Sequence, residues 1–159
     1  MVLGKKRKLG KKINELQVGE SYTAVHSIED KDLLLYLGLT NDANPLYIQH
    51  DYASQTPYQQ PIVPPIMLLG IVSSIVSMHL PGPGSHIISQ EITYPKPVFH
   101  SSEVTFTLEI AAINNDDHNI LLSVEGYNTE GQTVMTGNLK VCPVYKPNSL
   151  TANSLENFF

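Results

Sequence analysis

The chain has 159 residues, the size of one ordinary domain, and 42% of them are hydrophobic against 16% charged, which favours a folded globular protein over a disordered one. The net charge of −5 is unevenly distributed, because six of the ten basic residues precede residue 13 and residues 13–159 carry a balance of −11. This acidic body argues against nucleic acid as the main partner, since phosphate binding requires clustered Lys and Arg on the folded surface.

The apolar runs of the chain are too short for a membrane span. The longest, residues 66–72, contains Gly70 and falls well below the ~20 residues that cross a bilayer as a helix. The basic N-terminus lacks the apolar segment of a secretory signal. The single cysteine, Cys142, cannot form an internal disulfide and reads as a buried structural thiol. We therefore expect a cytoplasmic protein with no membrane span.

The first half of the chain predicts a strand and a helix. Residues 20–27 alternate as a short strand, and Ser27 is placed to cap a helix whose apolar face includes Leu33 and Leu37. Gly38 is the expected end of that helix. The segment that follows, residues 39–47, is expected to begin in a loop, where functional groups are often presented.

The second helix is predicted from two prolines and a long apolar run. Pro64 and Pro65 suit the first turn of a helix, and residues 66–79 then run apolar on nearly every side, which predicts burial of all faces. The remainder reads as strands separated by turn residues, at residues 85–94, 103–113, 119–128 and 132–141. Consecutive hairpins predict an α+β fold, an antiparallel sheet wrapped around a long central helix. We expect a basic flexible tail at residues 1–12, a single domain at 13–147 and a C-terminal tail at 148–159.

Residues 39–47 read Leu-Thr-Asn-Asp-Ala-Asn-Pro-Leu-Tyr, and this segment resembles the signature of the MaoC-like (R)-specific enoyl-thioester hydratases. That signature runs roughly Gly-Asp-x-Asn-Pro-[Ile/Leu]-His, followed six residues later by Ala. Asn41 stands where the family has Gly, and Tyr47 stands where it has His. The positions that fit are Asp42, Asn44, Pro45, Leu46 and Ala53.

The resemblance extends over most of the chain, with further matches at residues 61–62, 80–84, 94–99 and 131–137. It implies a hot dog fold and a homodimer or higher homo-oligomer in which two sheets become continuous. It also implies a hydro-lyase of fatty-acid metabolism that interconverts trans-2-enoyl and (R)-3-hydroxyacyl thioesters. The acyl group would be carried by coenzyme A or acyl carrier protein, with no separate cofactor and no metal. The basic tail is then either a solvated terminus or a source of positive charge near the phosphates of that carrier.

The resemblance also assigns roles to residues. Asp42 matches the catalytic Asp, and Asn44 matches the Asn that orients the site loop. Pro45 would fix the turn and contact substrate, while Tyr47 falls on the catalytic His. At the start of the central helix, Pro64-Pro65 replaces the family's His-Gly. The substrate-binding positions implied there are Pro65, Ile66 and Met67.

Both departures matter chemically. A tyrosine phenol titrates near 10, so Tyr47 is a donor and not a base at neutral pH. Pro65 has no N–H to offer a thioester oxygen, which leaves Ile66 as the alternative donor. Two alternatives could supply the missing base. Asp42 could act alone beside the acyl site, or His50 could replace the imidazole if residues 47–53 form one helix.

Three functions therefore remain in view. The first is an atypical hydratase or dehydratase with Asp42 as principal acid/base. The second is a non-catalytic acyl-CoA-binding protein that keeps the groove without the chemistry. The third is a partner subunit of a heterodimeric dehydratase in which only the other chain carries the Asp and His.

Overall fold

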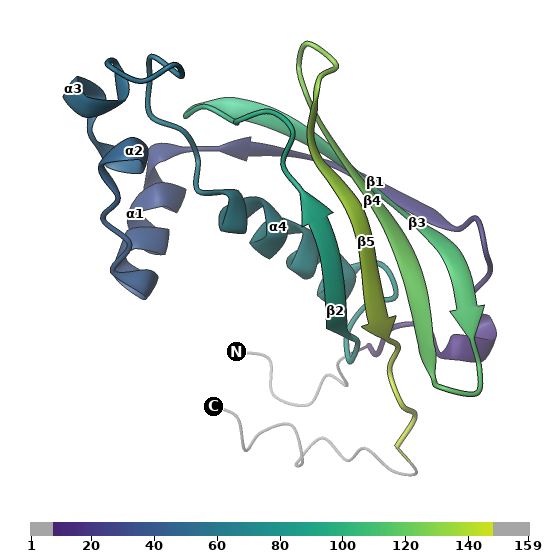
Figure 1. Ribbon diagram of the computed structural model, residues 1–159. Helices are drawn as coiled ribbons and strands as arrows, with labels where there is room; N and C mark the ends of the chain where they lie inside the picture. Colours follow the sequence, from purple (N-terminus) through teal and green to yellow (C-terminus); the bar gives the residue numbers. More distant parts are fainter. Residues whose placement is uncertain (1–7, 148–159) are drawn as a thin grey trace.

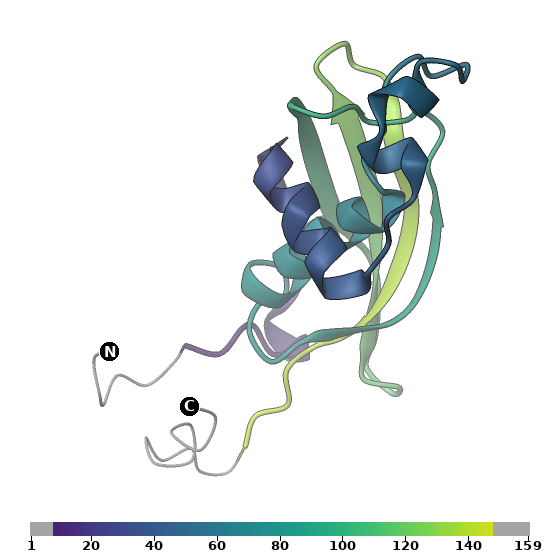
Figure 2. The ribbon, with the colours of Figure 1, turned by 90° about the vertical axis from the view of Figure 1, so that its left-hand side faces the viewer.

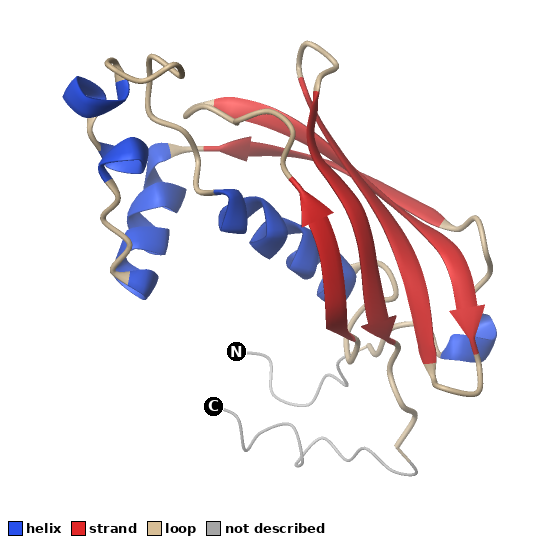
Figure 3. Cartoon of the chain, in the orientation of Figure 1, coloured by secondary structure: helices blue, strands red, loops and turns tan. Residues whose placement is uncertain are grey.

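The computed structural model describes residues 8–147, which form a five-stranded antiparallel sheet and four α-helices (Figures 1 and 3). The strands are β1 (Ser21–Ile28), β2 (His86–Thr93), β3 (Ser102–Asn114), β4 (Asn119–Asn128) and β5 (Thr133–Cys142). The helices are α1 (Asp30–Thr40), α2 (Pro45–Ile48), α3 (His50–Ala53) and α4 (Pro65–Met78), and a short 3-10 helix, η1 (Ile13–Glu15), precedes β1. Every predicted strand is confirmed to within one residue at each end.

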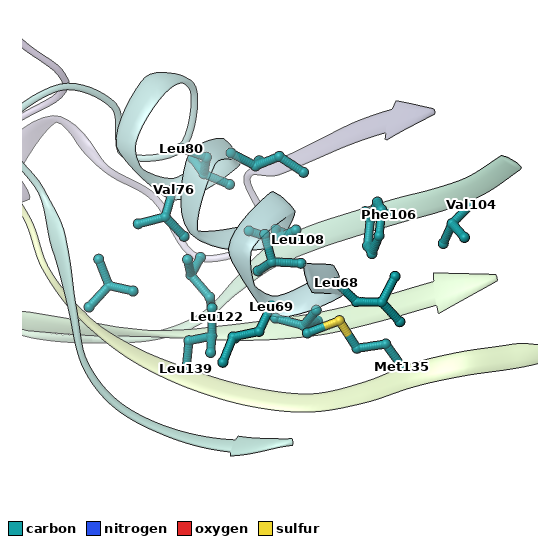
Figure 4. Packing of buried hydrophobic residues seen from close by; sticks show 14 of the residues in the cluster. Leu68, Leu69, Val76, Leu80, Val104, Phe106, Leu108, Leu122, Met135 and Leu139 are labelled. Atoms are coloured by element: carbon teal, nitrogen blue, oxygen red, sulfur yellow. The ribbon is translucent and has the colours of Figure 1, made fainter. Parts of the chain in front are cut away.

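The core lies between α4 and the concave face of the sheet (Figure 1). Strand β3 shows why, because Val104, Phe106, Leu108 and Ile110 alternate with more exposed residues and are fully buried. Figure 4 shows strand residues of this layer gathered around α4. Burial of each such side chain contributes about 1.5–3 kcal/mol. Cys142 is 7% exposed, as expected of a structural thiol.

Helix α4 begins as predicted, with Pro64 as N-cap and Pro65 as its first residue. The prediction that the helix is buried on every face is wrong. Ile66 and Met78 are 51% and 59% exposed, and Gly70 and Ser74 between them are also exposed. Because these residues are spaced by four, they form one stripe along the helix. The sheet curves around only the opposite side (Figure 1).

Helix α1 differs from prediction at both ends. Its N-cap is Glu29, whose N–H donates to the Asp32 carboxylate at 2.9 Å in a reciprocal capping box. Ser27 is not the cap because β1 continues to pair with β3 through Ile28. Gly38 lies inside the helix, which ends where Asn41 takes a left-handed conformation with φ of 57°. Asn is one of the few residues other than Gly that adopt this conformation readily.

Strand β2 pairs with a strand distant in sequence. The sheet order is β1-β3-β4-β5-β2, so β2 lies beside β5. It does not pair with β3, the next strand in sequence, to which residues 94–101 connect it. The β3-β4 and β4-β5 hairpins form as predicted. Among the described residues no strand pairs with the outer edge of β2. An unpaired edge of this length is a natural place for another strand to add.

Residues 8–12, expected to belong to the flexible tail, contact the loop that follows α4. The Gly10 amide donates to the Pro83 carbonyl at 2.8 Å, and the Lys11 amide donates to the Pro81 carbonyl at 2.9 Å. At least this part of the predicted tail is therefore attached to the domain. Residues 1–7 and the predicted C-terminal tail, residues 148–159, lie outside the described residues. No helix within residues 8–147 is long and apolar enough to cross a membrane.

Candidate active site

Asp42 is half-buried just beyond the end of α1 and accepts a hydrogen bond from a residue of that helix. The donor is the hydroxyl of Tyr36, whose Oη lies 2.7 Å from Asp42 Oδ2. Tyr36 is itself only partly exposed. A hydrogen bond to an ionised carboxylate is among the stronger ones in proteins. The contact fixes the direction in which the Asp42 side chain points.

The Thr40 side chain hydrogen-bonds to the backbone of both Tyr36 and Asp42. Its Oγ1 donates to the Tyr36 carbonyl at 2.7 Å and accepts from the Asp42 amide at 3.2 Å. The left-handed turn at Asn41 makes this possible, because it reverses the chain directly after the helix. Asp42 is therefore held by both its main chain and its side chain.

Asn44 and Pro45 organise the next turn. Asn44 is the N-cap of α2, where its Oδ1 accepts from the Leu46 amide at 3.0 Å, and Pro45 is the first residue of the helix. Both side chains are exposed. Asn44 thus stabilises the first turn of α2, while its role in orienting the site loop stays a prediction. Tyr47 follows on α2, close enough to Asp42 for the carboxylate charge to act on its hydroxyl.

The two tyrosines beside Asp42 favour their protonated forms. Burial raises the pKa of Tyr47, the negative charge of Asp42 raises that pKa further, and the Asn44 side chain opposes the shift. Burial is also the main cause that raises the pKa of Tyr36, followed by its hydrogen bond to Asp42. Both phenols are therefore hydrogen-bond donors at neutral pH. For Tyr47 this agrees with the prediction that it is not a base.

An apolar groove of about 690 Å³ runs between α1, β1 and α4. Figure 2 shows α1 in front of α4, and the groove uses the exposed stripe of α4 as its floor. Ile66 and Met67, both predicted to bind substrate, line it at the start of α4. Asp42, Asn44, Pro45, Tyr47 and Pro65 are not among the lining residues. Tyr36 and Thr40 do line the groove and so connect it to Asp42.

The start of α4 offers a single amide near the groove. Pro64 and Pro65 have no N–H, and the Met67 amide donates to the Pro64 carbonyl at 2.9 Å. For the Ile66 amide no backbone acceptor is recorded within the described part of the chain. A free amide at a helix N-terminus attracts negative charge. Ile66 thus retains the donor that Pro65 lacks.

His50 does not share a helical face with Tyr47. Gln49 is extended between them, with φ of −117° and ψ of 110°, and it divides the segment into α2 and α3. His50 is exposed at the start of α3. The condition for its rescue role, one continuous helix through residues 47–53, is not met.

Tyr36 is the site residue that the sequence did not single out. It lies six positions before Asp42 in the apolar run 33–39 of α1, where an aromatic side chain is typical of the core. One feature of the sequence could have pointed to it. Tyr36 and Thr40 are one helical turn apart and so share a face of the helix immediately before Asn41-Asp42.

Comparison with known proteins identifies the group to which this arrangement belongs. The sequence model of the MaoC-like domain family matches residues 12–132 of this chain. The chain belongs to the MaoC-like family. A MaoC-like relative, the (R)-specific enoyl-CoA hydratase of Aeromonas caviae, is 28% identical over 122 residues, which cover 77% of this chain and 91% of the relative.

Solved structures agree with the MaoC-like assignment. The (R)-hydratase from A. caviae involved in PHA biosynthesis superposes with a TM-score of 0.77 at 27% identity, covering 80% of this chain and 97% of that one. The R-hydratase of Pseudomonas aeruginosa gives a TM-score of 0.78 at 22% identity, covering 89% and 94%. The predicted hot dog fold is confirmed by these likenesses and by the sheet wrapped around α4.

Proposed function

We propose that this MaoC-like protein is a hydro-lyase that adds water to trans-2-enoyl thioesters or removes it from (R)-3-hydroxyacyl thioesters. The observation that carries the proposal is the Asp42 carboxylate, which is held at 2.7 Å by Tyr36, a residue that lines the apolar groove. A fixed carboxylate beside an apolar site is suited to general acid/base work. The hydratase names of the relatives support the same reaction class.

Each residue has a defined part in the proposed hydration. Asp42 removes a proton from water as the water oxygen attacks C3 of the enoyl thioester, and electron density moves to the thioester oxygen. The Ile66 amide, at the positive end of α4, stabilises that oxygen. The Asp42 carboxylic acid then protonates C2, which restores the carboxylate. Tyr47 acts as a donor that orients the water.

The acyl chain is proposed to lie in the groove along α4, with its carrier outside. Coenzyme A and acyl carrier protein are both candidates for that carrier. The basic N-terminal segment contributes less charge to such a site than its composition suggests, because Lys11 is paired with Glu20 at 2.9 Å and Lys12 with Glu15 at 3.4 Å. We also propose a homodimer formed through the free edge of β2, in a reducing, cytoplasmic setting that suits the free Cys142 thiol. Light scattering of the purified protein tests the dimer.

The reaction is tested by following loss of enoyl absorbance with crotonyl-, octenoyl- and dodecenoyl-CoA. Asp42→Asn is expected to lower kcat/KM by a factor of about 10² to 10⁴, the usual contribution of a general base. Asp51→Asn is the matched control, because Asp51 is an exposed carboxylate on α3. Full activity in Asp42→Asn would reject the proposal.

A binding protein without catalysis is the second candidate, favoured by one observation. Pro64 and Pro65 remove two amides from the start of α4, where the reaction needs donors. Calorimetric titration with a non-hydrolysable acyl-CoA analogue separates the two functions. Tight binding with no turnover of any enoyl-CoA supports the binding protein, whereas turnover that depends on Asp42 supports the hydro-lyase.

A further inference from the structure

We propose that Tyr36 is the positioning residue for Asp42, so that a tyrosine-held carboxylate serves as the acid/base of this site in place of the family's Asp-His pair. The inference rests on the proposed function and assigns a role to a residue outside the signature segment. It depends on three observations, which are the hydrogen bond itself, the shared anchor at Thr40 and the position of the Tyr36 ring in the groove.

The hydrogen bond distinguishes the two carboxylate oxygens of Asp42. Tyr36 Oη donates to Oδ2 at 2.7 Å. Among residues 8–147, no other side chain donates a hydrogen bond to this carboxylate. Oδ1 is therefore the oxygen left to accept a proton from water. In the proposed cycle Oδ1 takes the water proton and later delivers a proton to C2, while Tyr36 keeps its own proton throughout.

The pair is rigid because one hydroxyl fixes both partners. Thr40 Oγ1 donates to the carbonyl of Tyr36 and accepts from the amide of Asp42. Asp42 and Tyr36 therefore move together with the last turn of α1. Such anchoring matters for catalysis, since a displacement of about 1 Å at a reacting group can cost on the order of 10²-fold in rate.

The Tyr36 ring brings this pair to the substrate. Tyr36 lines the groove, where Ile66 and Met67 of α4 are also found. A chain lying in the groove would thus pass the ring whose hydroxyl holds Asp42. Tyr47 is less suited to the positioning role. The Asp42 charge affects its pKa, but the direct hydrogen bond to Asp42 is made by Tyr36.

Tyr36→Phe is the decisive variant because it keeps the ring and removes only the hydroxyl. We expect kcat with octenoyl-CoA to fall on the order of 10²-fold, with KM changed by less than about twofold because the groove wall is intact. Tyr52→Phe, on exposed α3, is the matched control and is expected to match wild type in both constants. A circular dichroism melt of each variant establishes that the fold is retained.

A second measurement tests the pairing without relying on turnover. In protein labelled with ¹³C at the tyrosine ring carbon that bears the hydroxyl, the NMR titration of Tyr36 is compared between wild type and Asp42→Asn. The carboxylate raises the pKa of this phenol, so Asp42→Asn is expected to lower it.

The outcomes separate the inference from the proposed function. Unchanged kcat in Tyr36→Phe, with activity lost in Asp42→Asn, overturns the role of Tyr36 and leaves the hydro-lyase standing. An unchanged Tyr36 titration in Asp42→Asn also overturns the inference alone. Absence of turnover in wild type with every enoyl-CoA overturns both. A drop in kcat at constant KM, together with the lowered Tyr36 pKa, supports the inference.

Discussion

The Tyr36 hydroxyl donates a 2.7 Å hydrogen bond to Asp42 across the turn that ends α1. The bond joins a groove-lining residue of α1 to the carboxylate that we propose as the general base. It also supplies a partner for Asp42 in a segment where the resemblance predicts histidine and the chain has Tyr47. Several substitutions distinguish a site rebuilt in this way from a damaged one.

Tyr47→His tests whether the departure at this position has been compensated. Because Asp42 Oδ2 is already held by Tyr36, we expect restoration of the imidazole to change kcat/KM by less than about tenfold, compared with the ~10² or more that a needed general base supplies. Steady-state hydration of octenoyl-CoA is the measurement, with Tyr52→His on α3 as control. A gain of two orders of magnitude would show that the natural site is damaged.

Pro65→Ala tests the oxyanion donor. The substitution gives the first residue of α4 an N–H beside that of Ile66 and keeps a good helix former at the position. We expect kcat to rise by up to about 10², the effect of one oxyanion donor. Pro57→Ala adds an N–H in the exposed turn that follows α3, away from the groove, and serves as control. Equal rates for Pro65→Ala and wild type would mean that the α4 terminus does not hold the reacting oxygen.

Gly70→Phe tests whether the groove holds the acyl chain. Gly70 lines the groove, and a Cβ added there meets no neighbouring element within 4 Å, so a phenyl ring at this position would extend into the groove. The ratio of kcat/KM for dodecenoyl-CoA to that for crotonyl-CoA is expected to fall at least about tenfold. Gly38→Phe is the matched control, a glycine on α1 that also faces open space but does not line the groove. Equal ratios in the two variants would place the acyl chain elsewhere.

Two alanine substitutions at glycine are expected to have opposite effects on stability. Gly70→Ala should raise the free energy of unfolding by about 0.5–1 kcal/mol, because alanine restricts the unfolded chain and fits an open helical position. Gly137→Ala should lower the free energy of unfolding by about 1–3 kcal/mol. The reason is that φ at Gly137 is 153° and a Cβ there would overlap the Glu91 carbonyl oxygen. Urea unfolding measures both, and the same sign for both would contradict the expectation.

The sequence predicts elements governed by local pattern. The alternation at Val104, Phe106 and Leu108 defines β3, and Pro64 with Pro65 marks the start of α4. The pairing of β2 with β5 was not predictable, because it joins residues about fifty positions apart. The N-cap of α1 was misplaced for a related reason, since the pairing of Ser27 with Glu103 keeps that residue in β1.

The site was predictable only where the signature is continuous in sequence. Asp42 and Asn44 were found from the motif, but Tyr36 reaches Asp42 only through the left-handed turn at Asn41. The exposed stripe of α4 was missed because Ile66 and Met78 at its ends are as apolar as the buried residues of the helix. Only the small residues Gly70 and Ser74 between them mark the open side.

Helix α4 has one side in the core, where Leu68, Val72 and Val76 are buried, and another open to the groove, where Gly70 and Ser74 lie. A substitution on the open side removes no side chain from the core. Under the proposed function, single replacements on that side would change acyl preference while the core contacts of α4 stay as they are. One helix thus supplies both packing for the fold and a surface on which selectivity can vary.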